Sequence, residues 1–191
     1  MAVDRGRIER AVVDMLEAIG EDPHRPGLER TPARVADAYA EFFAGLDADP
    51  LDHLRSPLPV DASGTSEAVI LRDIAFRSVC EHHLLPFVGI AHVAYLPREK
   101  VIGLSKIPDV VATLSARPQL QERLAEQIAD TLEVGLEPNG VLVVLDAVHR
   151  CVAARGSRQA ESSTVTIVSR GRLTNPLERA EIIGLIGASR V

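Results

Sequence analysis

The chain has 191 residues, of which 46% are hydrophobic and 25% charged, so its length and composition suit one globular domain with an appended segment. The formal net charge of −6 excludes a nucleic-acid-binding protein that relies on a broad basic surface. No run of about 18 apolar residues occurs and the N-terminal residues lack the apolar core of a signal peptide, so we expect neither a membrane span nor export.

The N-terminal part is expected to hold two helices. Apolar residues recur with a helical period over residues 7–19, and Gly20 is a natural C-terminal stop. Thr31 is expected to cap a second helix, with Pro32 at its first helical position, and this helix should end at Gly45.

A linker is expected to follow these helices. Residues 47–66 are rich in proline, glycine and small polar residues and show no sustained period. We therefore place a boundary there, with residues 1–60 as an N-terminal helical segment and linker, and residues 61–191 as the catalytic domain.

The second part of the chain groups its strands in pairs. The expected elements are strands over 67–80 and 85–96, helices opened by Ser105 and by Pro118, the second ended by Gly135, strands over 141–148 and 162–169, and a last helix capped by Asn175. Strands and helices segregated in this way favour an α+β fold with an antiparallel sheet over a doubly wound parallel one.

Histidines gather beside the two cysteines, Cys80 and Cys151. His82, His83 and His149 lie within three residues of a cysteine, where chance placement would put about 0.4 histidines. Two cysteines are too few for a disulfide framework, so we expect reduced thiols in a cytoplasmic protein. Two buried cysteines with unrelated histidines nearby would also give this pattern, but the excess favours a metal site.

The spacing suits a zinc ion with an open position. Cys80 and His83 could meet one ion through a tight turn, and the segment from His149 to Cys151 could supply a third ligand, since residues 149 and 151 of a strand share a face. A Cys₂His set suits Zn²⁺ and leaves the fourth position for catalysis. Spacing alone does not say which histidine binds the metal and which carries protons. The chain has no GxxxxGK[ST] or GxGxxG element, so a nucleotide would be held by other means.

Several segments resemble the GTP cyclohydrolase I family. They are, in chain order, RTPARVADAY (30–39), CEHH (80–83), VAYLP (93–97), GLSKI (103–107), RPQLQERL (117–124) and HRCVAARG (149–156). The resemblance implies the tunnelling fold, in which ββααββ subunits assemble into a toroidal homodecamer with sites at subunit interfaces. It also implies a small-molecule purine nucleotide as substrate: GTP is converted to 7,8-dihydroneopterin triphosphate and formate, in folate or pterin biosynthesis.

The resemblance also assigns roles to residues. The zinc ligands would be Cys80, His83 and Cys151. His149 would protonate N7 of the purine while a water activated by zinc attacks C8, and His82 would assist proton transfer during ring opening. The matching segments imply that Glu122 binds the base and that Lys106, Arg34 and Arg155 contact the triphosphate. Gln121 and Ser105 are two further expected substrate contacts.

Three positions depart from the family pattern. Asp37 and Asp109 stand where the family carries basic residues that reach the phosphates, and Ser157 replaces an Ile or Val. The aspartates either repel a triphosphate or turn away from it. Three interpretations stay open: a GTP cyclohydrolase I, a paralogue that opens the ring of a less phosphorylated guanine nucleotide or nucleoside, and a non-catalytic zinc-binding protein of the same fold.

Overall fold

A computed structural model describes residues 3–60, 67–155, 158–159 and 161–187. Its centre is a five-stranded sheet in the order β5-β2-β3-β6-β7. The long strands are β2 (Val69–Cys80), β3 (Pro86–Leu96), β6 (Gly140–His149) and β7 (Thr164–Gly171), each antiparallel to its neighbour. The short strand β5 (Pro118–Gln119) runs parallel to the last residues of β2. The predicted antiparallel sheet is confirmed.

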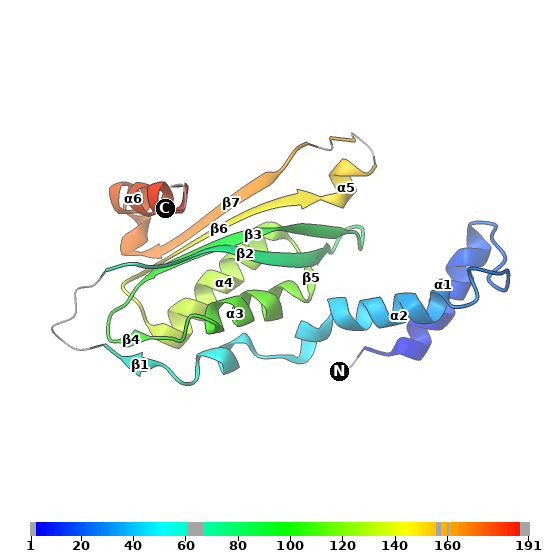
Figure 1. The fold of residues 1–191 in the computed structure, drawn as a ribbon, viewed down its shortest axis with the longest axis horizontal. Coiled ribbons are helices and arrows are strands. Elements are labelled where there is room, and N and C mark those ends of the chain that lie inside the picture. Colours follow the sequence, from blue (N-terminus) through cyan, green and yellow to red (C-terminus); the bar gives the residue numbers. More distant parts are fainter. Residues whose placement is uncertain (1–2, 61–66, 156–157, 160, 188–191) are drawn as a thin grey trace.

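Two helices cover one face of this sheet, as Figure 1 shows. They are α3 (Lys106–Ser115) and α4 (Gln121–Leu136), whose apolar faces pack on the sheet. Leu132 of α4 belongs to the main core together with Phe87 and Val143 of the sheet. The order β2-β3-α3-α4-β6-β7 is the expected ββααββ order.

The C-terminal helix α6 (Pro176–Gly187) lies on the other face (Figure 1). It follows the 3₁₀ helix η3 (Arg172–Thr174), and Leu173 and Ile182 pack with Leu142 in a second, smaller apolar cluster. The side chain of Asn175 accepts a hydrogen bond from Leu177 N at 2.9 Å, so the predicted cap of this helix is confirmed.

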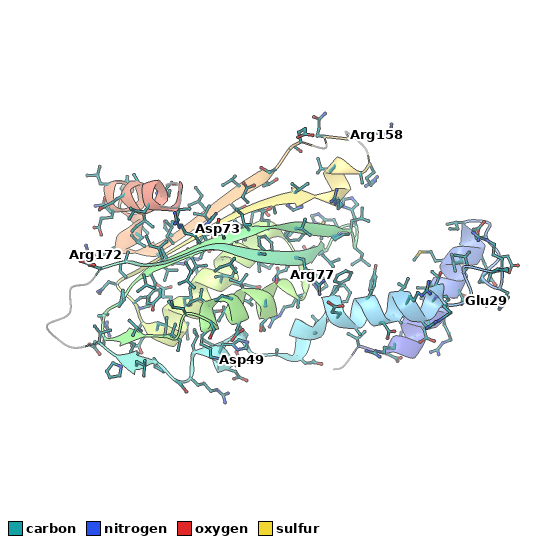
Figure 2. The ribbon with its side chains drawn as sticks, in the orientation of Figure 1. Glu29, Asp49, Asp73, Arg77, Arg158 and Arg172 are labelled. Carbon is teal, nitrogen blue, oxygen red and sulfur yellow. The ribbon has the colours of Figure 1, made fainter. Side chains whose placement is uncertain are left out.

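The N-terminal helices α1 (Arg5–Ala18) and α2 (Thr31–Phe42) pack against each other and extend away from the sheet (Figure 1). Arg77 of β2 attaches the end of α2 to the body, since it pairs with Glu41 and its guanidinium lies 5.5 Å from the centre of the Phe42 ring. Figure 2 shows Arg77 at this junction. No helix among the described residues is long and apolar enough to cross a bilayer.

Two predicted helix starts were wrong by one to three residues. The second helix begins at Thr31 itself, with Arg30 as the residue before it and no side-chain cap. Pro118 does not open a helix, because Pro118 and Gln119 pair with the end of β2, and α4 begins at Gln121. Sheet pairing therefore overrides the usual preference of proline for the first helical position.

The expected end of α4 at Gly135 was also displaced. The helix continues through Leu136, and Glu137 adopts the left-handed conformation with φ 49°. Gly135 lies inside the helix, at a position where a methyl group would collide with Leu54. The glycine serves a close approach between two segments instead of ending the helix.

The segment expected to be an irregular linker is partly ordered against the body. It contains the 3₁₀ helices η1 (Ala44–Asp47) and η2 (Pro50–Leu54) and the short strand β1 (Leu58–Pro59), which pairs with β4 (Lys100–Val101). Leu54 is only 3% exposed and belongs to the main core. Residues 61–66 of the expected linker, and Ser157, lie outside the described residues.

Candidate metal centre and active site

Three strand ends meet at one end of the sheet (Figure 1). β2 ends at Cys80, β3 begins at Pro86 opposite Val79, and the pairing of Phe87 with His149 brings the end of β6 to the same place. Antiparallel pairing thus gathers residues that lie about 70 positions apart in the sequence.

The turn between β2 and β3 folds His83 back over Cys80. Cys80 N donates to Leu85 O and Leu84 N donates to Cys80 O, both at 2.9 Å. Leu84 has φ 51°, a left-handed conformation that is unusual for a residue with a branched side chain. As a result His83 Nδ1 lies 3.9 Å from Cys80 Sγ.

Cys151 completes the cluster from a different local structure than the sequence suggested. β6 ends at His149, and Cys151 belongs to the single helical turn α5 (Arg150–Ala153). The strand geometry proposed for positions 149 and 151 was therefore wrong, because the chain turns before Cys151. The helical turn nevertheless carries its thiol to the other two donors.

The donor atoms of Cys80, His83 and Cys151 all lie within 4.8 Å of one another. Ligand atoms around a tetrahedral zinc ion are separated by about 3.6–3.8 Å, so the three need to move together by at most ~1 Å. Cys80 is buried, Cys151 is half-buried and His83 is exposed, so the cluster opens to the surface on one side. The donor set fits a zinc ion with one free position.

The electrostatics of the two thiols also fit a cation. Burial raises the pKa of the Cys151 thiol, and the neighbouring Cys80 thiol raises it further. Two thiols in contact resist ionising together, whereas a divalent cation stabilises both thiolates. The positive charge of Arg155 lowers the pKa of Cys151, which is the direction in which a bound metal cation would also act.

His149 is held on two sides. Its ring stacks on Phe87 with centroids 4.6 Å apart and planes 7° from parallel, and its Nε2 lies 2.7 Å from Oε1 of Gln121. Burial lowers the pKa of His149, and the nearby charge of Glu122 opposes this. A neutral, fixed imidazole beside the metal cluster can exchange a proton with a bound substrate.

His82 has a different environment. Its side chain is 64% exposed, its Nε2 lies 4.0 Å from Glu81 Oε1, and its ring meets that of His83 edge-on at 6.2 Å. Glu81 in turn forms two hydrogen bonds with Arg123, at 2.6 and 3.1 Å, and this contact lowers the pKa of the Glu81 carboxyl. The ion pair between Glu81 and Arg123 joins the turn that contains His83 to the first turn of α4.

The structure brings together only some of the residues predicted for the site. Near the cluster lie the predicted residues His82, Gln121, Glu122, His149 and Arg155, together with Cys80, His83 and Cys151. Ser105 and Lys106 stand at the start of α3, whose ten residues span about 15 Å and whose other end leads to β5 beside Cys80. Arg34 lies on α2, in the helical pair that extends from the body (Figure 1).

The sequence did not predict a place in the site for Phe87, Glu81 or Arg123. Phe87 gave no signal, because an aromatic residue in a strand is ordinarily core, and here it is also 0% exposed. Glu81 and Arg123 adjoin Cys80 and Glu122 in the quoted segments, but only the fold shows that these two segments touch.

The comparisons with known proteins agree with this site. The sequence profile described as GTP cyclohydrolase I matches residues 8–187. A relative named GTP cyclohydrolase 1 from Leifsonia xyli subsp. xyli (strain CTCB07) is 64% identical over 184 residues, which cover 96% of both chains. Another of that name, from Geobacillus kaustophilus (strain HTA426), is 50% identical over 97% of this chain and 98% of its own.

The solved structures that the chain matches are more distant in sequence. The archaeosine synthase QueF-Like in its apo form is 19% identical, with a TM-score of 0.47, and the alignment covers 57% of this chain and 97% of that one. The match of the family profile spans the metal cluster, His149 and the ββααββ order, and the chain therefore has the tunnelling fold. Because the profile and the relatives cover almost its whole length, the chain belongs to the GTP cyclohydrolase I family.

Proposed function

We propose that this protein is a zinc-dependent hydrolase that opens the imidazole ring of GTP and yields 7,8-dihydroneopterin triphosphate and formate. The observation that carries the proposal is the cluster of Cys80, His83 and Cys151 beside a fixed His149, in a chain of this family. Zinc bound by these three residues would supply the Lewis acidity that activates water near neutral pH.

The histidines would move the protons. His149 would protonate N7 of the purine, which makes C8 more electrophilic. His82 is exposed beside the cluster and would carry a proton as the ring opens and C8 leaves as formate. His83 would be the metal ligand, since its Nδ1 lies 3.9 Å from Cys80 Sγ.

Glu122 would hold the base. It lies in the first turn of α4, exposed and close enough to His149 to affect its pKa. A carboxylate accepts two hydrogen bonds, and guanine presents N1–H and its exocyclic amine side by side. Gln121 and Arg155 would complete the part of the site that one chain provides.

The remaining substrate contacts would come from other copies of the chain. Ser105, Lys106 and Arg34 stand on elements that lie away from the metal cluster, so a complete site needs a homo-oligomer, for which the family's toroidal decamer is the expected form. The edge strand β7 supports assembly, since its Val165 and Ile167 are 57% and 48% exposed. We place the enzyme in the cytoplasm and keep the division into segments 1–60 and 61–191.

A less phosphorylated guanine substrate is the second candidate. It is favoured by one observation: Lys106, expected at the triphosphate, pairs with Asp109 at 3.4 Å. This contact would weaken its attraction for phosphate. A non-catalytic zinc protein is disfavoured, because His149 would then have no purpose beside an open metal position.

The metal assignment is tested with Cys151→Ser. We expect about one zinc per wild-type chain, and loss of both bound zinc and formate release in the variant, while its circular dichroism is unchanged. Metal analysis and formate release from GTP are measured on the same samples. A Cys151→Ser protein that keeps its zinc and its activity would refute the assignment.

A further inference from the structure

We propose that Gln121 is a positioning residue that fixes the proton of the neutral His149 ring on Nε2 and leaves Nδ1 as the nitrogen that meets the substrate. This role replaces the substrate contact expected of Gln121, whose amide is fully engaged within the chain, and it rests on the proposed function only in giving His149 a substrate to meet.

The orientation of the Gln121 amide is set by its own partners. The side chain belongs to a residue that is 1% exposed, and its Nε2 lies 3.2 Å from Leu145 O and 2.8 Å from Thr164 O. Both partners are backbone carbonyls, which only accept hydrogen bonds, so they must face the NH₂ group of the amide. Both amide hydrogens are therefore used by β6 and β7, and Oε1 must be the atom that faces His149.

The orientation of the amide decides the tautomer of His149. The Oε1 atom of Gln121 carries no hydrogen, and it lies 2.7 Å from Nε2 of His149. A hydrogen bond between these atoms requires the proton on Nε2. In the neutral ring Nδ1 then holds a lone pair and can accept a proton, which it would pass to the substrate.

The stacking of Phe87 keeps the ring in this orientation. Phe87 is fully buried and lies parallel to the imidazole at 4.6 Å, so the ring plane is fixed by the core. A 180° rotation of the ring about its Cβ–Cγ bond would keep the ring plane but carry Nε2 away from Gln121. The buried amide oxygen would then have no hydrogen-bond partner, which costs free energy. One face of the ring and one nitrogen are thus held, and Nδ1 has no hydrogen-bond partner among the residues that the structure describes.

The same helical turn would then perform two tasks. Gln121, the first residue of α4, points inward to β6 and β7, while Glu122, the next residue, is exposed. The start of α4 would orient His149 through Gln121 and bind the base through Glu122. It is held by β5, which pairs with β2, and by Arg123, which pairs with Glu81 in the turn after β2. A shift of this helical turn would change the orientation of His149 and the binding of the base together.

The test reads the tautomer directly. Metal-loaded protein with ¹⁵N-labelled histidine is studied by solid-state NMR without substrate, and His149→Ala identifies the His149 signals by their absence. In the wild type we expect the proton on Nε2. In Gln121→Met, which has similar volume but no acceptor, we expect the Nδ1–H form to appear. A proton on Nδ1 in the wild-type protein would overturn the proposal.

Kinetics separate positioning from substrate contact. Gln121→Met should lower kcat for GTP by ~10–100-fold and leave KM nearly unchanged, because the variant still binds the base. Gln121→Glu keeps an oxygen opposite Nε2, so it should retain the Nε2–H form and recover part of kcat, but it should lose stability because its other oxygen faces the carbonyls of Leu145 and Thr164. A raised KM with unchanged kcat and unchanged tautomer in Gln121→Met would instead make Gln121 a substrate contact, contrary to the proposal.

Gln119→Met is the matched control. Gln119 is 2% exposed and its amide bonds to Leu114 O at 2.9 Å and to Gln127 Oε1 at 2.8 Å, away from His149. This variant should lose stability as Gln121→Met does, yet keep the tautomer and kcat. The same changes in Gln119→Met would contradict a specific role of Gln121. Because the tautomer is measured without substrate, the result tests this proposal whether or not the protein turns over GTP.

Discussion

At the scale of single residues, three histidines close together have three different environments. His83 lies against the Cys80 thiol, His149 is stacked and hydrogen-bonded, and His82 is mostly exposed. Their positions in the sequence do not separate these roles, because His82 and His83 are neighbours in one turn. Contacts made across the fold separate them.

His83→Ala and His149→Ala should therefore differ in metal content. His83→Ala removes a ligand, so it should lose zinc and activity. His149→Ala should keep zinc and lose activity by ~10²-fold or more, because it removes only the proton carrier. Metal analysis of the purified variants decides between them, and loss of zinc from His149→Ala would show that the roles are assigned wrongly.

Asp109 tests how the phosphates are recognised. It lies one helical turn from Lys106 and pairs with it, and both side chains are nearly half exposed. Asp37, the other departure from the family, pairs with Arg5 at 3.1 Å on the exposed surface of the N-terminal helices. Each aspartate thus has a basic partner within its own chain, so neither is an isolated negative charge.

Asp109→Arg should lower KM for GTP by roughly tenfold and leave KM for guanosine unchanged, because it frees Lys106 and adds a cation. The gain should shrink as salt is added. Asp109→Asn, which only removes the charge, should give part of the effect. Equal changes for GTP and guanosine would mean that Asp109 does not act on the phosphates.

At the scale of elements, the sequence predicted the strands well and the junctions poorly. Runs of β-branched residues located β2, β3, β6 and β7, since such runs favour buried strands. The start of α4 was misplaced because Pro118 pairs with β2, a pairing between distant segments that periodicity does not reveal. Residues 149 and 151 were expected to share a strand face, but Cys151 lies on a helical turn. The cluster of Cys80, His83 and Cys151 could be predicted because cysteine and histidine are rare residue types in this chain, whereas Phe87 and Arg123 carry no such signal.

The end of α4 gives a pH-dependent contribution to stability. Glu137 accepts a hydrogen bond from Lys100 Nζ at 2.7 Å, and this contact lowers the pKa of its carboxyl below the ordinary 4.5. A lowered pKa in the folded state means that the contribution is present above pH 4.5 and is lost as pH falls through the lower value.

Glu137→Gln should therefore reduce Tm near neutral pH and match the wild type in acid. Thermal unfolding is followed at several pH values from about 6 to about 3, and high salt should diminish the difference. A difference in Tm that stays constant over this range would show that the ion pair with Lys100 is not its source.

At the scale of the whole molecule, the described chain holds one part of a site. The metal cluster and Glu122 lie at one end of the sheet, while the start of α3 lies near β4, at the opposite end in Figure 1. Under the proposed function, a substrate that touches both groups would lie between copies of the chain. Assembly would then be a condition for catalysis, and the exposed edge strand β7 would serve it.

Mixing two inactive variants tests this arrangement. Cys151→Ser lacks the metal site and Lys106→Ala lacks the phosphate contact, but a hybrid oligomer contains sites with both groups intact. A random equal mixture should regain about a quarter of the wild-type activity. Hybrids that form and stay inactive would mean that Lys106 acts in the same chain as the metal cluster.

Release of formate from guanine compounds by the zinc-loaded wild-type protein is the most direct test of ring opening at this site and of GTP as the substrate. GTP, GMP and guanosine labelled at C8 are compared at equal concentration, and the labelled formate is measured together with the pterin product. We expect one formate per 7,8-dihydroneopterin triphosphate from GTP, with far less from guanosine. No formate from any of the three would contradict ring opening at this site, and formate from guanosine in preference to GTP would contradict GTP as the substrate.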